Sequence, residues 1–239
     1  MPDAILKTRN VSKHFGGFVA LENVDFDVGT GERVGLLGPN GSGKSTLVNC
    51  ITGTLHNDTG DVVFQGENLN RMVTHQRIRR GVSRTFQIPR PFRSMTVREN
   101  VDIALMYAAD VPASSESREA MAILEQVGLG KQADTETRQL SQVELRKLEL
   151  ARAMAARPQL LISDEAMAGL SSNEVSEVLE ILLRLNASGI TVIMIEHIMQ
   201  AVMKFSQRVV CLDAGRIICE GAPAHIVADK DVQRAYLGA

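Results

Sequence analysis

The sequence predicts an α/β fold in three parts: a core with a parallel sheet, an antiparallel β part and an inserted helical part. Residues 18–28 alternate apolar and polar side chains, as a half-buried antiparallel strand does. Short apolar runs at 33–38, 159–163 and 189–195 are typical of buried parallel strands. The segment at about 89–156 has a helical character throughout.

The N-terminal part of the chain alternates strand patterns with one helix. Apolar residues and turn residues define the boundaries of each element. We expect strands at 5–12, 18–28, 33–38 and 61–65, an extended segment at 82–87, and a helix over about 44–52 after a Gly-rich turn.

Two capping boxes mark helix starts in the middle of the chain, Thr96 with Glu99 and Ser141 with Glu144. A third helix, over 115–127, is closed by a glycine, and the helix from Ser141 ends before a proline at about 156. We therefore expect one domain over 1–239, with a core at about 1–88 and 157–239 and a helical subdomain at about 89–156.

The C-terminal part returns to alternating strands and helices. A helix should begin at Ser171, where a serine and a glutamate three residues later form another capping box. That helix should end at Gly189. Further strands are expected at 159–163, 189–195, 208–212 and 216–220. A short helix is expected over 198–205, and the tail should be helical.

Composition excludes several classes of protein. Of 239 residues, 44% are hydrophobic and 23% are charged, which is typical of a globular chain. The net charge of −2 and the absence of Trp argue against nucleic acid, so no nucleic-acid partner is expected. No apolar run reaches membrane-spanning length, and the first ten residues lack the apolar core of a signal peptide. Three cysteines make no disulfide framework, which favours a reducing, cytoplasmic location.

A phosphate-binding loop is the strongest motif. Residues 38–45, GPNGSGKS, match G-x-x-x-x-G-K-[ST] between an apolar strand and a helix. Glycines let backbone amides turn toward a phosphate, and the helix dipole favours the same anion. Lys44 would reach the β- and γ-phosphates and Ser45 would ligate Mg²⁺. This predicts a P-loop NTPase core whose nucleotide-binding residues are Gly38, Asn40, Gly41, Ser42, Gly43, Lys44, Ser45 and Thr46.

Two carboxylates follow the buried run at 159–163. Asp164 and Glu165 would lie at the carboxyl edge of the parallel sheet, where ligands of open α/β folds bind. Asp164 would hold Mg²⁺, directly or through water, and Glu165 would orient or deprotonate the attacking water. Without the phosphate loop, the same pair could simply cap the next loop.

Together these motifs resemble the nucleotide-binding domain of ABC transporters, over essentially the whole chain. The resemblance implies ATP as the nucleotide, Phe15 as the ring stacked on adenine, Gln87 as a ligand of Mg²⁺ and water, and His197 near the γ-phosphate. Taken alone, Phe15 could be a core residue and His197 a structural histidine. The segments 83–87, 195–199 and 234–238 are most similar to ATP-binding subunits of branched-chain amino-acid importers.

One motif departs from that family. Its usual Leu-Ser-Gly-Gly-Gln is here LSQVE at residues 140–144, in which Ser141 would touch the nucleotide held by the opposite subunit. Val143 restricts the backbone, and the charge of Glu144 opposes a phosphate. Ala166 and Ser171 also replace family residues near the expected dimer interface. The sequence therefore predicts a heterodimer with a related ATPase subunit, in which one site is efficient.

A basic segment suggests the contact with membrane subunits. Residues 68–98 contain eight Arg and no Asp or Glu. A solvated face is the alternative explanation. By resemblance, integral-membrane permease subunits would dock between Gln87 and Arg98, with residues 89–92 as the exposed anchor. The chain would then be a peripheral protein at the cytoplasmic face of the inner (plasma) membrane.

The functional prediction is a Mg²⁺-dependent ATP hydrolase that drives uptake of a small polar solute, with amino acids as the expected class. Three other functions remain open at this point. They are an ATP-binding regulatory subunit with little hydrolysis of its own, a soluble ABC-type ATPase, and a small-molecule kinase.

Overall fold

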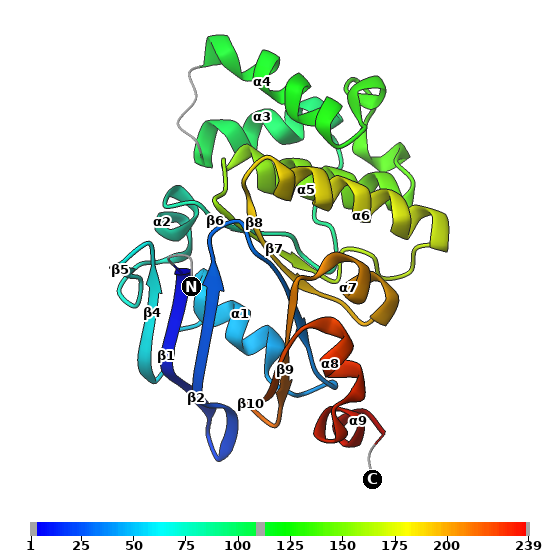
Figure 1. Ribbon diagram of the computed structural model, residues 1–239. Coiled ribbons are helices and arrows are strands. Elements are labelled where there is room, and N and C mark those ends of the chain that lie inside the picture. The colour runs from blue at the N-terminus through cyan, green and yellow to red at the C-terminus, as the bar shows by residue number, and fades with distance from the viewer. Residues whose placement is uncertain (1–3, 109–112, 238–239) are drawn as a thin grey trace.

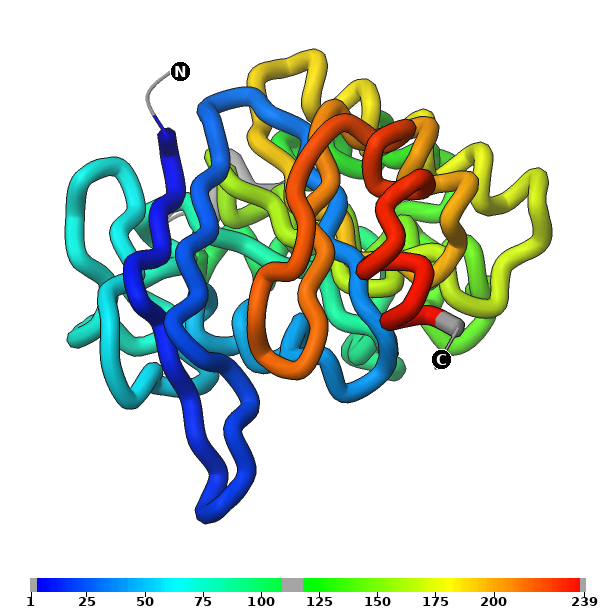
Figure 2. Tube along the Cα trace, turned by 60° about the horizontal axis from the view of Figure 1, so that its bottom comes forward, coloured from blue at the N-terminus to red at the C-terminus, as the bar shows by residue number. Residues whose placement is uncertain are grey.

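The computed structural model describes residues 4–108 and 113–237 and contains two sheets (Figure 1). The smaller sheet is antiparallel and has the order β2-β1-β4-β5. The long β1–β2 hairpin projects from the body of the molecule (Figure 2). The strands are β1 (Ala4–Phe15), β2 (Phe18–Gly29), β4 (Thr59–Phe64) and β5 (Glu67–Asn68).

The larger sheet has the order β10-β9-β3-β8-β7-β6. Its strands are parallel except β10, which pairs antiparallel with β9. Parallel strands bring their carboxyl ends to one edge, so the segments after β3, β6, β7 and β8 meet there. The strands are β3 (Arg33–Leu37), β6 (Val82–Arg84), β7 (Leu160–Asp164), β8 (Thr191–Ile195), β9 (Arg208–Asp213) and β10 (Arg216–Gly221).

Two hydrophobic cores cover the two faces of the larger sheet. Its strands supply alternate residues to each core, as the period of two requires: Val192 and Met194 face one, Ile193 and Ile195 the other. The first core also contains α5 (Gln142–Ala155), α6 (Ser172–Ala187) and α7 (Met199–Phe205). The second fills the space between the two sheets around α1 (Lys44–Thr52).

A helical block lies at one end of the molecule, where α3 and α4 stand beyond α5 (Figure 1). Thr96 caps α3, because its Oγ1 accepts from the Glu99 backbone N–H (3.2 Å), and its own backbone N–H donates to Glu99 Oε2 (2.7 Å). A short antiparallel bridge joins Thr96 to Glu136. The block contains α3 (Val97–Ala108), α4 (Ala113–Gln126), α5 and short 3₁₀ turns at Gly130–Gln132 and Thr137–Gln139.

The remaining helices are short. Among the described residues, no helix is both long and apolar enough to span a bilayer. The helices are α2 (Thr74–Arg79), α8 (Pro223–Ala228) and α9 (Lys230–Leu237).

Most predicted elements are confirmed, with three differences. The extended segment expected at 82–87 ends as a strand at Arg84, because the next residues turn toward the edge of the sheet. Within the segment expected to be helical at about 89–156, residues 89–96 form no helix, and the first helix begins at Val97, where the capping box at Thr96 predicts its start. Helix α2 and strand β5 were not predicted, since α2 has little apolar periodicity and β5 has only two residues.

Candidate functional site

The phosphate loop connects β3 to α1 and leaves the start of that helix open. Gly43 precedes α1 with φ 106°, and no side chain caps the helix there. A Cβ on Gly43 would lie 2.6 Å from the Ala20 carbonyl oxygen, and one on Gly38 would lie 2.1 Å from that of Leu212. Only glycine fits at these positions. The first backbone amides of α1 are therefore available to an anion.

Lys44 begins α1 with its side chain folded into the loop. Its ammonium donates to the carbonyl oxygens of Gly38 (2.7 Å) and Pro39 (2.9 Å). The side chain is buried, and burial lowers the pKa of Lys44. No carboxylate forms an ion pair with it in the described structure. A phosphate would supply the negative charge that a buried ammonium requires.

The C-terminal helix reaches the same loop. The backbone N–H of Gly38 donates to the hydroxyl of Tyr236 on α9 (2.9 Å). This bond gives the first amide of the loop a partner inside the protein, while the amides at the start of α1 have no side-chain cap.

A cleft of about 210 Å³ opens over the loop. Glu165 and His197 face it from the ends of β7 and β8, and Phe18 and Ala20 come from β2. The cleft thus lies at the carboxyl edge of the parallel sheet, where the sequence predicts that a ligand binds. The loop contributes Asn40, Gly41, Ser42, Gly43, Lys44, Ser45 and Thr46.

Three predicted residues form one hydrogen-bonded cluster at this cleft. Glu165 Oε2 accepts from Gln87 Nε2 (2.5 Å), and Glu165 Oε1 lies 2.9 Å from His197 Nε2. Glu165 has φ 47°, a backbone conformation that L-residues rarely adopt and that is often found at functional sites. The cluster places a carboxylate beside the phosphate loop with an amide and an imidazole fixing its orientation.

Asp164 lies directly before this cluster and is nearly buried. Its Oδ2 accepts from Arg84 Nη2 (2.7 Å). Burial raises the pKa of Asp164, and the charge of Arg84 opposes that shift. The same guanidinium donates to Asn49 Oδ1 on α1 (2.6 Å). From the sequence, Arg84 is predicted only as part of the basic segment, and Asn49 has no predicted role.

The donor set fits Mg²⁺ held together with a nucleotide. Among the described residues there is no group of three or more His, Cys, Asp or Glu that could hold a metal unaided. Mg²⁺ at phosphate sites takes few protein oxygens and completes its shell with phosphates and water. Ser45, Asp164 and Gln87 offer a hydroxyl, a carboxylate and an amide oxygen, which suits that mode.

Comparison with known proteins identifies the family of this chain. The family model described as "ABC transporter" matches residues 21–168, and the model "Branched-chain amino acid ATP-binding cassette transporter" matches residues 216–239. The chain belongs to the ABC transporter family. The expected α/β fold and ATP-hydrolysing enzyme class are confirmed, and ATP is the nucleotide of this ABC-type ATPase.

Individual relatives match over nearly the whole length. The high-affinity branched-chain amino acid transport ATP-binding protein LivG of Escherichia coli K12 is 36% identical, over 100% of this chain and 99% of its own. A nucleotide-free ATP-binding cassette superposes with a TM-score of 0.91 at 32% identity, covering 99% and 100% of the two chains. A dimeric post-hydrolysis cassette bound to ADP and Pi gives 0.81 at 26% identity, covering 91% and 98%.

The aromatic ring at the ATPase cleft is Phe18. Phe15, the residue predicted to stack on adenine, does not line the cleft. It pairs with Phe18 at the end of the β1–β2 hairpin and lies 5.6 Å from the Lys13 ammonium. Both rings are about half exposed, so the role of Phe15 stays a prediction.

The segment at 140–144 forms a closed helix start. Ser141 Oγ accepts weakly from the Glu144 backbone N–H (3.4 Å). Glu144 Oε2 accepts from both the backbone N–H and the hydroxyl of Ser141 (2.8 Å each). Gln132 donates to the same carboxylate (3.1 Å). These bonds, with the backbone N–H of Ser141 contributing most, lower the pKa of Glu144. Ser141 does not line the cleft of its own chain.

Two buried charged residues near the cluster were not predicted from the sequence to have a role in the site. Arg146 on α5 donates to the carbonyl oxygens of Gln87 and Ala168, and so ties the loop of Gln87 to the segment after Glu165. Glu196 accepts from the Met167 N–H (2.8 Å), and burial raises its pKa to about 7. Single charges in apolar patterns gave no sign that they were buried.

The basic segment at 68–98 is not one continuous face. Arg77 is fully buried and donates to the Cys50 and Ile51 carbonyl oxygens at the end of α1. Arg84 pairs with Asp164, whereas Arg90 and Arg93 are exposed. The arginines of this segment therefore divide between internal contacts and the exposed surface, and docking between Gln87 and Arg98 stays a prediction.

Proposed function

We propose that this ABC-type ATPase is the energy-coupling subunit of an importer and uses ATP hydrolysis to drive uptake of a small polar solute, with amino acids as the solute class. The cluster of Gln87, Glu165 and His197 beside the phosphate loop carries the catalytic part of the proposal. The solute class rests on the relative named as a branched-chain amino acid transport protein and on the C-terminal family match.

The residues suggest an in-line attack of water on the γ-phosphate. Glu165 would orient that water and take its proton, because its carboxylate is fixed from both sides. Lys44 and His197 would stabilise charge on the transferred phosphoryl group. Ser45, Asp164 and Gln87 would hold Mg²⁺, which neutralises charge on the phosphate oxygens when bound.

The proposed assembly contains a second nucleotide-binding subunit. The related dimeric cassette supports two subunits facing each other. The closed helix start at Ser141 supports a heterodimer, because its donors already have a carboxylate as acceptor. A related ATPase with an open segment would complete the site over this chain's phosphate loop. Ser141 would then contact the nucleotide held by the partner more weakly than the partner's open segment contacts the nucleotide held by this chain.

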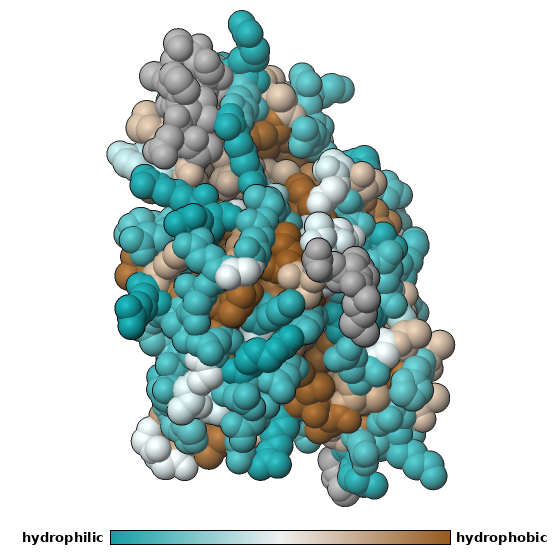
Figure 3. Space-filling view, turned by 60° about the vertical axis from the view of Figure 1, so that its left-hand side comes forward, coloured by the Kyte–Doolittle hydropathy of each residue, from teal (hydrophilic) through white to brown (hydrophobic). Residues whose placement is uncertain are grey.

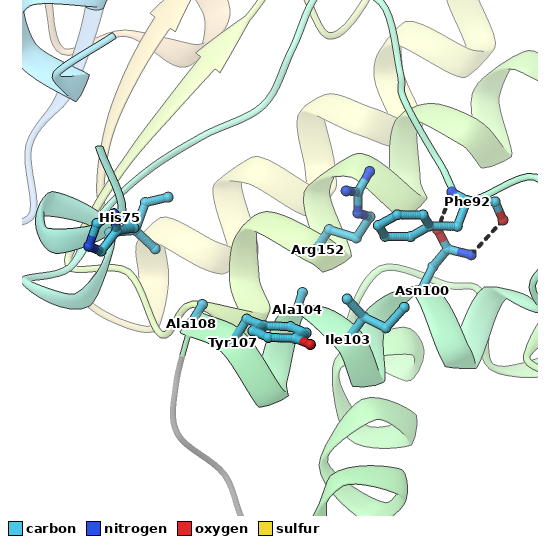
Figure 4. A pocket seen from close by; sticks show the side chains of 9 residues that line it. His75, Phe92, Asn100, Ile103, Ala104, Tyr107, Ala108 and Arg152 are labelled. Atoms are coloured by element: carbon cyan, nitrogen blue, oxygen red, sulfur yellow. Dashed lines mark hydrogen bonds between the residues drawn. The ribbon is translucent and has the colours of Figure 1, made fainter. Parts of the chain in front are cut away.

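The proposed permease contact is a groove of about 220 Å³ between α2 and α3 (Figure 4). The Phe92 ring lies 5.6 Å from the Arg152 guanidinium, and Asn100 holds the Phe92 backbone at both N–H and carbonyl oxygen. The exposed ring of Tyr107 lines the same groove. An amphipathic helix of a membrane subunit suits such a groove.

The surface around the groove supports this contact. Apolar patches interrupt the hydrophilic surface on the side of α2, β4 and β5 (Figure 3). Ile88, within the segment from Gln87 to Arg98, is 69% exposed, which is unusual for isoleucine unless a partner covers it. We therefore place the chain at the cytoplasmic face of the plasma membrane as a peripheral subunit, with residues 89–156 as the helical subdomain that meets the permease.

ATP hydrolysis by the purified chain tests the catalytic proposal. Steady-state hydrolysis should be low for the chain alone and rise when a related ATPase subunit is added. Glu165→Gln should abolish that gain while ATP binding persists, since the amide cannot take a proton. Turnover that survives Glu165→Gln would refute the role of Glu165. Binding without turnover in every combination would favour a regulatory subunit, which the closed helix start also suits.

Charge reversal tests the docking surface. Arg90→Glu with Arg93→Glu should weaken recovery with the permease subunits from detergent-solubilised membranes and leave ATP binding unchanged, because both side chains are exposed outside the cleft. Lys131→Glu on the short turn after α4 is the matched control. Equal recovery of both proteins would place the contact elsewhere.

A further inference from the structure

Arg84 occupies a position between the two functional segments of the cleft. It is the last residue of β6 and pairs in parallel register with Ile162 of β7. One terminal nitrogen donates to Asp164 and the other to Asn49 on the helix of the phosphate loop. Its guanidinium carbon lies 4.9 Å from the centre of the Phe86 ring. The side chain thus contacts the acidic strand end, the nucleotide helix and its own loop.

The residues after Arg84 are tied to the same strand end. Thr85 Oγ1 accepts from the Asp164 N–H (3.1 Å), and the Thr85 N–H donates to the Ile162 carbonyl oxygen (2.9 Å). Gln87 donates to Glu165. A shift of Asp164 would therefore be transmitted to the loop that carries Gln87.

The pair of Arg84 and Asp164 is shielded from water, with side chains 13% and 9% exposed. Removing one member of such a pair leaves a charge without compensation. The bond is nevertheless incomplete on the arginine side: within the described structure, the Arg84 Nε–H is buried and has no acceptor. A second cation bound to the Asp164 carboxylate would compete with Arg84, because two positive charges that contact the same carboxylate repel each other.

We propose that Arg84 is a positioning residue that neutralises Asp164 while no metal is bound and releases it when Mg²⁺ arrives. Metal binding would then loosen residues 84–86 from β7, while Gln87 exchanges its bond to Glu165 for the metal. This inference rests on the Mg²⁺ site proposed above. A guanidinium that merely orients Asp164 would act in the opposite direction, because its loss would weaken metal binding.

Metal affinity separates the two roles. Mn²⁺ binding to the ADP-loaded full chain can be followed by electron paramagnetic resonance. Arg84→Met should bind Mn²⁺ about five- to tenfold more tightly than the wild type, because the competing charge is absent. Arg84→Lys retains the charge and should stay within about twofold of the wild type. Arg208→Met, which breaks an ion pair with Glu32 away from the cleft, is the matched control and should leave Mn²⁺ affinity unchanged.

Hydrogen exchange measures how firmly the backbone of this loop is held. In the wild type, Mn²⁺ added to the ADP complex should speed exchange of the amides at 84–86. In Arg84→Met these amides should exchange quickly from the start and respond little to Mn²⁺. Weaker or unchanged Mn²⁺ binding by Arg84→Met overturns the inference and leaves the metal site standing. Failure of the wild-type ADP complex to bind Mn²⁺ overturns the metal site and, with it, this inference.

Discussion

The starts of α1 and α5 show how similar local structures gain different chemistry. Both helices begin after an irregular loop, and both have the positive end of the helix dipole at that start. At α1 the preceding residue is Gly43, and no side chain accepts a bond from the helix amides. At α5 Ser141 and Glu144 accept and donate to each other. The first start is open to a phosphate and the second is occupied by a carboxylate of its own chain.

The difference lies in where the negative charge comes from. The open start depends on a ligand for its anion, whereas the closed start carries a permanent one in Glu144. A closed start gains local stability from the cap and the dipole. The closed start also has less affinity for an external anion, because the Glu144 carboxylate already places a negative charge there. Substitutions that open one start or close the other therefore test whether the source of the negative charge decides which helix start can bind a phosphate.

The largest effect is expected for Lys44→Ala. Because the buried ammonium lies inside the loop, its loss should weaken ATP binding by about 100- to 1,000-fold. Calorimetric titration with ATP measures the change. Lys204→Ala, an exposed lysine on α7, is the control and should bind as the wild type. Unchanged affinity in Lys44→Ala would mean that the open start does not hold the nucleotide.

Gly43→Ala should disturb the open start through its backbone. The new Cβ would meet the Ala20 carbonyl oxygen at 2.6 Å in a left-handed conformation. The free energy of unfolding in urea should fall by about 2–3 kcal/mol. Gly41→Ala, which shares a positive φ but has open space, should cost only about 1 kcal/mol. Equal losses would show that the contact with Ala20 is not limiting.

Opening the second helix start should increase catalysis. Val143→Gly with Glu144→Gln removes a branched side chain and a charge from the start of α5. Hydrolysis by the assembled complex should rise by about tenfold, because the phosphate held by the opposite subunit would meet free amides. Glu99→Gln changes an equivalent capping box on α3 and should leave turnover unaltered. An unchanged rate in the double variant would contradict the proposed cause of the asymmetry.

The smallest effect is expected for Glu144→Gln alone. At about pH 7 the neutral side chain caps the helix less well, and the free energy of unfolding should fall by about 0.5–1 kcal/mol. Because the folded-state pKa of Glu144 is lowered, this stabilisation exists above the unfolded pKa and disappears as pH falls through the folded value. Urea unfolding of both proteins across this pH range should show the difference vanish in acid. A constant difference would exclude a charge effect.

The sequence predicted the phosphate loop and the acidic strand end because their chemistry is local. Eight consecutive residues define the loop, and Asp164 and Glu165 adjoin an apolar run. The family resemblance added Gln87 and His197, and the structure brings both to Glu165. The capping box at Ser141 was equally visible, because its two members are three residues apart.

The contacts that position those residues could not be predicted. Arg84 and Arg77 belong to one basic segment of the sequence, yet one pairs with Asp164 and the other caps the end of α1. Arg146 reaches Gln87 and Ala168 from a different helix. Such contacts depend on how β6, β7 and α5 pack together, and composition alone does not distinguish a buried arginine from a solvated one.

The hydrogen bond from Gly38 to Tyr236 has a consequence for synthesis of the chain. The two residues are 198 positions apart. At a translation rate of about 5–20 residues per second, the ribosome adds the tyrosine roughly 10–40 s after the glycine. During that interval the emerging loop already has its sequence but lacks one of its native partners. The phosphate-binding loop therefore cannot complete its hydrogen bonding until the chain has been synthesised as far as Tyr236.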